Sequence, residues 1–339
     1  MIFEENKSLK EYTTFKIGGP ARFFCTVRHE DELMRALEYA QEKGVPIFIL
    51  GGGSNILVSD TGFAGLVIKM EIKGIRFTDD VHGNARVTAH AGDDWEHLVD
   101  ETVRRGLYGL ENLSLIPGSV GAAPVQNIGA YGSEVKDTID HVRVYDREKK
   151  EFITILNYDC HFGYRTSAFK ENPYRYIIIS ITFILKKQGK VNIEYRELKE
   201  YFVKIGQLQP TIAEVRNAVI SIRTTKLPNI AKTGTAGSFF KNPVISHSQA
   251  HELKVKYTDM PVYPVNEEYV KVSLAWIIDK VCGYRGVTRG EVGTYRNQAL
   301  VIVNNGNATA REVIAFAEEL KNSIKEKTNI VAEFEVQII

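Results

Sequence analysis

The segment from Ile116 to Gly132 constrains the fold of this 339-residue chain more than any other part of it. Its sequence, IPGSVGAAPVQNIGAYG, contains four glycines and three alanines. Such a segment is too small and too often interrupted by proline to fill an ordinary core, yet it lacks the polarity of a solvent-exposed loop. Glycine lets the backbone approach a ligand closely, so this composition favours a backbone surface that supports a large, flat ligand.

A second glycine cluster, Gly51–Gly53, directly follows an apolar run that ends at Leu50. Consecutive N–H groups in a glycine-rich turn can bind an anion such as a diphosphate. Gly51 and Gly53 have the spacing of the dinucleotide fingerprint, but its third glycine position holds Ile56, and the chain has no P-loop. A tight turn without a ligand is the alternative interpretation of this motif.

Length, charge and cysteine content limit the class of protein. The chain exceeds the size at which one hydrophobic core usually stops growing, so we expect two or three domains. Lys plus Arg number 43 and Asp plus Glu 42, and the net charge of +1 offers no field to attract nucleic acid. The N-terminus is acidic and polar, unlike a secretory signal, and the most apolar run, 176–185, is about half of a membrane span. Three separated cysteines predict no disulfide framework, so we expect a cytoplasmic protein with reduced thiols.

Apolar periodicity predicts an α+β fold. Helical spacing predicts helices over 30–43, 93–105, 211–224, 246–257, 273–281 and 309–327. Strands are expected at 45–50, 65–70, 85–91, 140–145, 152–156, 176–185, 299–303 and 331–339. Because helices dominate after about Thr211, we expect a second domain to begin near that residue.

Several polar residues are candidates for chemistry, and each has an ordinary alternative. Ser238 lies between a glycine and two phenylalanines, but no Gly-x-Ser-x-Gly elbow surrounds it. Arg165 could form a surface ion pair, and Glu335 could lie on a solvent-exposed strand face. His247 and His251 lie four apart on a predicted helix, but the glutamate of His-Glu-x-x-His is missing, so we predict no metal site.

Taken in order, these segments resemble the UDP-N-acetylenolpyruvoylglucosamine reductase family, flavoenzymes of peptidoglycan precursor synthesis. The resemblance extends from residue 12 to 336, nearly the whole chain. Its pieces are YTTFKIGG at 12–19, GGGSN at 51–55, the segment 116–132, YRTSAFK at 164–170, RTTKLP at 223–228, AGSFFKNP at 236–243, AWIID at 275–279, QAL at 298–300 and EV at 335–336. No single piece is specific, but the ordered set is.

The resemblance implies a two-part FAD-binding region of the vanillyl-alcohol-oxidase/PCMH type over residues 1–210, divided near residue 70. A smaller α+β substrate-binding domain would follow over 211–328, and residues 329–339 would return as a strand to the active site. The FAD is expected to be non-covalent and to take hydride from NADPH. The residues implied to bind it are Gly51, Gly52, Gly53, Ser54, Asn55, Ile116, Pro117, Gly118, Ser119, Gly121 and Ala122.

The same resemblance implies that Arg165, Ser238 and Glu335 are catalytic. Hydride addition to the enolpyruvyl ether leaves negative charge on the neighbouring carbon and its carboxylate, and this charge must be stabilised where it develops. Arg165 offers a planar pair of donors, and a protonated Glu335 offers a further hydrogen bond. Ser238 would then donate the proton, which a hydroxyl can do because an enediolate is a strong base.

Substrate contacts are implied for Tyr131, Tyr195, Lys226, Asn242 and Gln298. Tyr195 resembles the tyrosine of a loop that closes over the uridine diphosphate in one of the family's two subtypes, and it predicts that subtype here. Phe334 departs from the family pattern, which has proline before the glutamate, and this bears on the backbone at Glu335. The implied partner is a nucleotide sugar, with no nucleic acid or membrane, and the family expectation is a monomer.

Two other functions are open at this point. A flavin oxidase of the same fold would oxidise an alcohol and pass electrons to oxygen, but it leaves Ser238 and Lys226 without roles. A nucleotide-sugar-binding module without redox activity would purify colourless and ignore NADPH. The presence of Arg165, Ser238 and Glu335 together favours the reductase over both.

Overall fold

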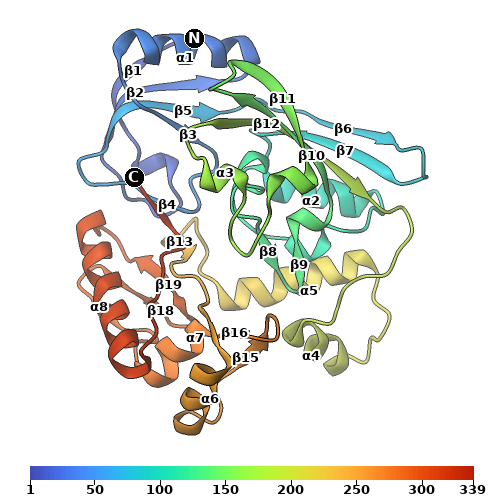
Figure 1. Cartoon of the computed structure of the whole chain (residues 1–339), viewed down its shortest axis with the longest axis vertical. Helices are drawn as coiled ribbons and strands as arrows, with labels where there is room; N and C mark the ends of the chain where they lie inside the picture. The colour runs from blue at the N-terminus through green and yellow to red at the C-terminus, as the bar shows by residue number, and fades with distance from the viewer. The chain divides into compact units, whose positions relative to one another are not determined.

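The computed structural model describes all 339 residues, which form two compact units. Unit 1 comprises Met1–Glu5, Phe23–Gly52 and Ala64–Arg223, and unit 2 comprises Asn6–Arg22, Gly53–Phe63 and Thr224–Ile339. Figure 1 shows the bulk of unit 2 in yellow to red. The change between units lies at 223/224, and two early segments join unit 2, so the units differ from the expected functional domains, which stay a prediction. No helix is long and apolar enough to cross a membrane.

Most elements of the first two thirds of the chain belong to unit 1. Its helices are α1 (Glu30–Lys43), α2 (Trp95–Arg104), α3 (Ala168–Glu171), α4 (Arg196–Lys204) and α5 (Ile212–Lys226), the last of which ends three residues beyond the unit. Its strands are β1 (Glu4–Ser8), β2 (Pro20–Val27), β3 (Ile47–Leu50), β5 (Phe63–Met70), β6 (Ile75–Asp79), β7 (Ala85–His90), β8 (Gly129–Ala130), β9 (Ser133–Glu134), β10 (Ile139–Asp146), β11 (Glu151–Leu156) and β12 (Tyr176–Leu185). Some residues of β1, β2 and β5 belong to unit 2.

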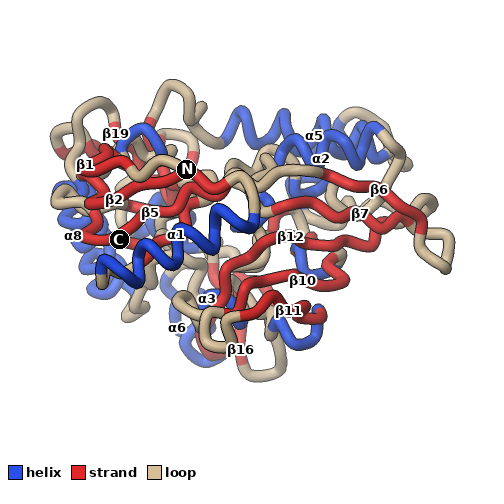
Figure 2. Tube along the Cα trace, turned by 90° about the horizontal axis from the view of Figure 1, so that it is seen from above, coloured by secondary structure: helices blue, strands red, loops and turns tan.

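Two sheets organise unit 1 (Figure 2). The larger sheet has the antiparallel order β11-β10-β12-β7-β6, with β12 in the middle. The largely apolar sequence of β12, interrupted only by Ser180 and Thr182 after its first residue, fits this place, because a central strand that is covered on both faces carries few polar residues. The smaller sheet has the order β1-β2-β5-β3, in which β3 and β5 are parallel and Leu50 is opposite Lys69.

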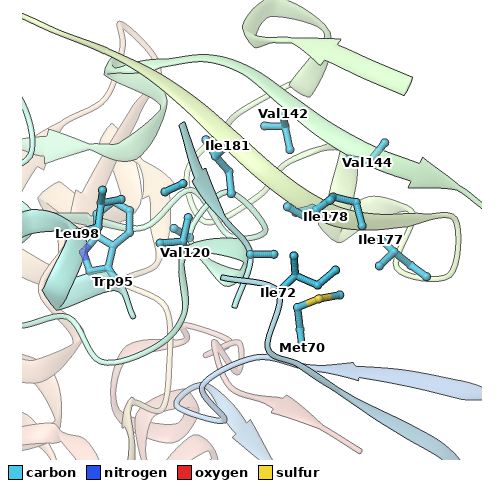
Figure 3. Packing of buried hydrophobic residues seen from close by; sticks show 14 of the residues in the cluster. Met70, Ile72, Trp95, Leu98, Val120, Val142, Val144, Ile177, Ile178 and Ile181 are labelled. Carbon is cyan, nitrogen blue, oxygen red and sulfur yellow. The ribbon is translucent and has the colours of Figure 1, made fainter. Parts of the chain in front are cut away.

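One hydrophobic cluster joins both sheets of unit 1 with α1 and α2 (Figure 3). Met70 ends β5, Ile72 follows it, Trp95 begins α2, and Ile178 and Ile181 belong to β12. The apolar face of α1 joins the same cluster, as its helical spacing predicted. Burial of apolar surface stabilises a fold by roughly 25 cal/mol per Å². We infer that this cluster is the main force that holds the glycine-rich segments of unit 1 in place.

Unit 2 contains the remaining elements. They are β4 (Ile56–Leu57), β13 (Gly234–Ser238), β14 (Val244–Ser246), α6 (His247–Lys256), β15 (Val262–Pro264), β16 (Tyr269–Val272), α7 (Leu274–Trp276), β17 (Thr288–Arg289), β18 (Val292–Tyr295), β19 (Gln298–Asn304), α8 (Ala310–Thr328) and β20 (Gln337–Ile338). The sheets have the orders β13-β19-β18-β17 and β14-β16-β15, and β20 pairs with β4. A capping box of Thr309 and Glu312 begins α8, and Asn329 ends it in the left-handed conformation.

Two sequence predictions need correction. The helix predicted over 273–281 is α7 followed by a π-helical turn, Ile277–Val281. The strand predicted over 331–339 is wrong in extent, because the segment changes partner part-way. Residues 333–335 pair with 239–241 through an isolated bridge, and only Gln337–Ile338 form a strand, parallel to β4. A single alternating pattern serves both pairings, so the sequence could not show the change.

Candidate active site

The first half of the glycine loop packs directly on the small-residue segment, and both belong to unit 1. A Cβ placed on Gly52 would lie 2.6 Å from the Cα of Gly118, and one on Gly51 would lie 2.5 Å from the Oγ of Ser119. These contacts leave no room for side chains. Two motifs that the sequence singled out separately therefore pack together through their backbones.

Ser119 has a buried hydroxyl next to the glycine loop. The residue is 7% exposed, and its Oγ has no hydrogen-bond partner in the protein. A buried hydroxyl without a partner costs free energy, so such groups usually bind a ligand or water. The adjacent Gly118 has φ +138°, a conformation that favours glycine. The orphan hydroxyl and the backbone cradle together fit the diphosphate of a dinucleotide such as FAD.

The second half of the glycine loop belongs to unit 2. Gly53 has φ +64°, and a Cβ there would meet the carbonyl oxygen of Tyr12 at 2.0 Å, so only glycine fits. Asn55 ties the loop to the end of the chain: its Nδ2 donates to the carbonyl of Glu335 at 3.2 Å, and its own carbonyl accepts from the N–H of Gln337 at 3.0 Å.

Ser238 is the last residue of β13, directly after an irregularity in the strand. The register between β13 and β19 shifts after Thr235, and Gly237 has φ +77°. Such a bulge reorients the following side chain. Phe239 and Phe240, both fully buried, then anchor the chain in the core of unit 2. The half-buried Ser238 is thus held between a glycine bulge and an aromatic anchor.

Glu335 lies on the segment paired with the residues that follow Ser238. Its N–H donates to the carbonyl of Phe239 at 2.9 Å, while the N–H of Lys241 donates to the carbonyl of Glu333 at 3.0 Å. Phe334 faces Phe240 in this bridge, and the hydrogen bonds on either side do not use its N–H. Proline at 334 would remove neither bond. Phenylalanine and proline at this position therefore allow the same backbone hydrogen bonds next to Glu335. The segments that carry Ser238 and Glu335 are thus adjacent within unit 2.

Arg165 belongs to unit 1 and has the unusual φ of +56°. Its guanidinium donates to the carbonyl of Gly129 at 3.2 Å and to that of Asn127 at 3.5 Å, and its own carbonyl accepts from Lys170 Nζ at 3.0 Å. The arginine is therefore seated on the small-residue segment.

Asn127 is a residue that sequence reasoning missed. It is fully buried, has φ +45°, and its Nδ2 donates to Gly163 and Glu134 at 3.0 Å each. It thereby joins the small-residue segment to the turn before Arg165. Asparagine tolerates the left-handed region better than most residues, but that tolerance leaves no mark that a single sequence would reveal.

Tyr131 and Tyr195 lie against each other in unit 1, with ring centroids 5.4 Å apart and an interplanar angle of 79°. Tyr131 packs with residues of α4 and α5 and hydrogen-bonds to the Arg223 guanidinium. Burial raises the pKa of the Tyr131 phenol to about 12. The Asn112 Nδ2 fastens the two tyrosine-bearing segments, because it donates to the carbonyls of Tyr131 and Asn192 at 2.8 Å each.

The other expected substrate residues are in unit 2. Lys226 is the last residue of α5 and is half-buried. Asn242 Oδ1 accepts from the N–H of Leu274 at 3.0 Å, and Gln298 Oε1 accepts from that of Leu300 at 3.3 Å. These contacts fix both side-chain amides. No group of three or more His, Cys, Asp or Glu side chains is arranged to hold a metal ion.

Comparison with known proteins identifies the family. A model of the FAD binding domain matches residues 21–153, and a model of the UDP-N-acetylenolpyruvoylglucosamine reductase C-terminal domain matches 229–339. The chain is 40% identical over 341 residues to the reductase of Flavobacterium johnsoniae, with 100% of both chains covered. It is 43% identical over 318 residues to that of Neisseria meningitidis serogroup A, with 93% of this chain and 91% of the relative covered.

The chain belongs to the UDP-N-acetylenolpyruvoylglucosamine reductase family. A solved reductase of this family, from Thermus caldophilus, is similar over 99% of both chains, with a TM-score of 0.69 and 28% identity. The expected fold, an α+β FAD-binding region of the PCMH type followed by the reductase family's C-terminal domain, is therefore confirmed. As a family member, the chain is an FAD-dependent oxidoreductase of peptidoglycan precursor synthesis. The roles of individual residues and the subtype stay predictions.

Proposed function

We propose that the chain uses NADPH to reduce the enolpyruvyl group of UDP-N-acetylenolpyruvoylglucosamine to the lactyl ether of UDP-N-acetylmuramate. The observation that carries this proposal is the pairing of the Ser238 and Glu335 segments through the Glu335 N–H and the Phe239 carbonyl, 2.9 Å apart. It fixes a hydroxyl and a carboxyl on adjacent stretches of backbone. An alcohol oxidase of the same fold has no need of this pair.

Non-covalent FAD, when bound, supplies a hydride to the terminal carbon of the enolpyruvyl group. The backbone groups of Gly51, Gly52 and Gly118 would hold its diphosphate, and the Ser119 hydroxyl would gain the partner that the protein does not give it. The remaining positions implied by the family are Gly53–Asn55, Ile116, Pro117, Gly121 and Ala122, and we propose that each contributes to FAD binding. Because nicotinamide and substrate would use one site in turn, ping-pong kinetics are expected.

Arg165 would hold the carboxylate of the enolpyruvyl group. Its guanidinium is oriented by the carbonyls of Gly129 and Asn127, and Lys170 holds its backbone. A fixed planar cation stabilises negative charge where it develops without having to reorganise during the reaction. Its main effect should therefore be on the reduction of substrate.

Ser238 and Glu335 would complete the reaction on the substrate. As negative charge develops on the carboxylate and its neighbouring carbon, a protonated Glu335 would hydrogen-bond to the enolic oxygens. The Ser238 hydroxyl would then give its proton to the carbon atom next to the carboxylate, and solvent would reprotonate the serine. The bulge at Gly237 aims the hydroxyl, and the aromatic anchor keeps it there.

The nucleotide part of the substrate would be held by side chains with more distributed roles. Lys226 suits the diphosphate as a point charge, and Asn242 and Gln298 suit the sugar nucleotide as hydrogen-bonding amides. Tyr131 would contribute from the end of the small-residue segment, and Tyr195 from the tyrosine loop, whose presence would assign the chain to the looped subtype. We propose that the enzyme acts as a monomer in the cytoplasm, where NADPH and nucleotide sugars are available.

An anaerobic stopped-flow experiment on purified protein tests the proposal. We expect NADPH to bleach the flavin absorbance and UDP-N-acetylenolpyruvoylglucosamine to restore it. Bleaching that is reversed only by oxygen would contradict the reductase and favour the oxidase. Protein without flavin would favour the binding module.

A further inference from the structure

Lys69 lies behind the glycine loop and has no assigned role. It is opposite Leu50 in the parallel pairing of β3 and β5, one residue before the loop begins. Its Nζ donates to the carbonyl of Gly51 at 2.6 Å, and its side chain is 19% exposed. A cation is thus brought into unit 1 to contact the backbone of a segment expected to bind an anion.

The geometry of the peptide bond gives this contact a direction. The carbonyl of Gly51 and the N–H of Gly52 belong to one peptide unit, and the chain has no cis peptide bonds. In a trans peptide the two groups point in opposite directions. A cation on the carbonyl therefore orients the N–H of Gly52 away from Lys69, and by polarising the peptide it makes that N–H a stronger donor.

An independent observation indicates a ligand at the same place. The Oγ of Ser119 lies 2.5 Å from where a Cβ of Gly51 would be, and this buried hydroxyl has no partner in the protein. Polar groups in such positions normally contact something, and a diphosphate offers several acceptor oxygens.

Burial gives Lys69 an energetic reason to face an anion. Burial lowers the pKa of the Lys69 ammonium, and the Glu71 carboxylate, 3.4 Å away, raises it in turn. Lys73 shares the same carboxylate at 2.8 Å but is 56% exposed and lies at the surface. Removing a cation from water is costly, and a nearby anionic ligand offsets that cost.

We propose that Lys69 is a positioning residue for FAD: it fixes the Gly51–Gly52 peptide so that its N–H faces the diphosphate, and it places positive charge behind that peptide. The inference rests on the proposed use of FAD. In this proposal Lys69 acts on FAD through the Gly51–Gly52 peptide and does not need to contact the cofactor directly.

The test measures FAD release from the holoenzyme. Holoenzyme is diluted in series, and the FAD that passes an ultrafiltration membrane is measured by its fluorescence. Lys69→Met should raise the dissociation constant of FAD about ten- to one-hundredfold, the loss expected for one charge-assisted hydrogen bond. Lys73→Met, the matched control that removes a lysine from the same carboxylate, should stay within about twofold, because exposed pairs contribute little.

Two further variants separate the charge from the fold. Lys69→Arg, which keeps a cation, should bind FAD more tightly than Lys69→Gln, which keeps only a neutral donor, even if Lys69→Met does not fold. Added salt should weaken FAD binding more in wild type than in Lys69→Gln. Equal FAD affinity in wild type and Lys69→Met, or equal losses at Lys69 and Lys73, would overturn the proposal. Wild-type protein that binds no FAD would overturn the proposed function as well.

Discussion

The two glycine-rich segments of unit 1 and the Ser238–Glu335 region of unit 2 are built by different means. The first is defined by the absence of side chains, since backbone contacts such as that of Gly52 with Gly118 leave no space for a Cβ. The second is defined by the pairing of distant segments and by the buried rings of Phe239 and Phe240. We infer that the first region mainly binds a ligand, whereas the second supplies groups for proton transfer. Changes in the first region should therefore lower FAD affinity and impair both half-reactions, whereas changes at Ser238 or Glu335 should mainly slow the reduction of substrate.

The largest effect is expected from Ser238→Ala. NADPH should still reduce the flavin, but reoxidation by substrate should slow by about 10²–10⁴-fold, the usual contribution of a general acid. The stopped-flow traces of the two half-reactions measure this directly. Ser246→Ala is the matched control, because it removes a hydroxyl from the same unit at the N-cap of α6 and should cost only about 1 kcal/mol of stability. Equal slowing of both half-reactions would refute the role of Ser238 as acid.

Gly52→Ala should have a smaller effect and act on the other region. The added methyl group would meet the Gly118 backbone at 2.6 Å, and overpacking of about 1–3 kcal/mol predicts that FAD affinity falls about ten- to one-hundredfold. Gly44→Ala is the control: its φ of +62° favours glycine, but no atom lies within 4 Å, so it should cost about 1 kcal/mol of stability and leave FAD binding unchanged. Both are read from FAD release and thermal melting. Similar FAD release from the two variants would show that the close packing of Gly52 on Gly118 does not govern FAD binding.

Phe334 tests whether the pairing or the ring holds Glu335. Its ring contacts those of Phe239 and Phe240 at centroid distances of 5.3 and 5.4 Å. Phe334→Ala should lower stability by about 2 kcal/mol and slow the substrate half-reaction about tenfold. Phe334→Pro keeps both flanking backbone hydrogen bonds and should be slowed less. If proline slows the reaction as much as Ser238→Ala does, the backbone pairing cannot be what positions Glu335.

The two regions also differ in how far the sequence predicted them. The density of small residues in 116–132 identified the first region from that segment alone. A run of small residues indicates close backbone contact whatever the segment packs against. In the second region, Ser238 and Glu335 are 97 positions apart, and only the resemblance to the family joined them before the structure was known. Periodicity located α1, α8 and β12 because each keeps one apolar pattern throughout its length. It could not show that residues 6–22 and 53–63 join unit 2, since such contacts depend on the whole fold.

The smallest effect on either region is expected from a substitution of Asp146, which ends β10 in the larger sheet of unit 1. This fully buried carboxylate accepts three hydrogen bonds from Arg175 and two from the N–H groups of Glu148 and Lys149. The hydrogen bonds from Arg175 are the largest cause that lowers the pKa of Asp146 below its ordinary value of 3.8. A carboxyl whose pKa is lowered by folding stabilises the protein above the unfolded pKa, and this contribution is lost as the pH falls through the folded pKa.

Asp146→Asn should therefore lower the free energy of unfolding by about 2 kcal/mol at neutral pH while both half-reactions and FAD release stay close to wild type. The difference in stability from wild type should narrow as the pH falls below about 4, because the wild-type carboxyl then becomes protonated. Urea unfolding followed by circular dichroism at several pH values measures both. A difference that does not change with pH would mean that the shape of the side chain, and not its charge, supports the sheet. A change in only one half-reaction would contradict our expectation, because it would show that this sheet position affects one step of the reaction selectively and not only the stability of the protein.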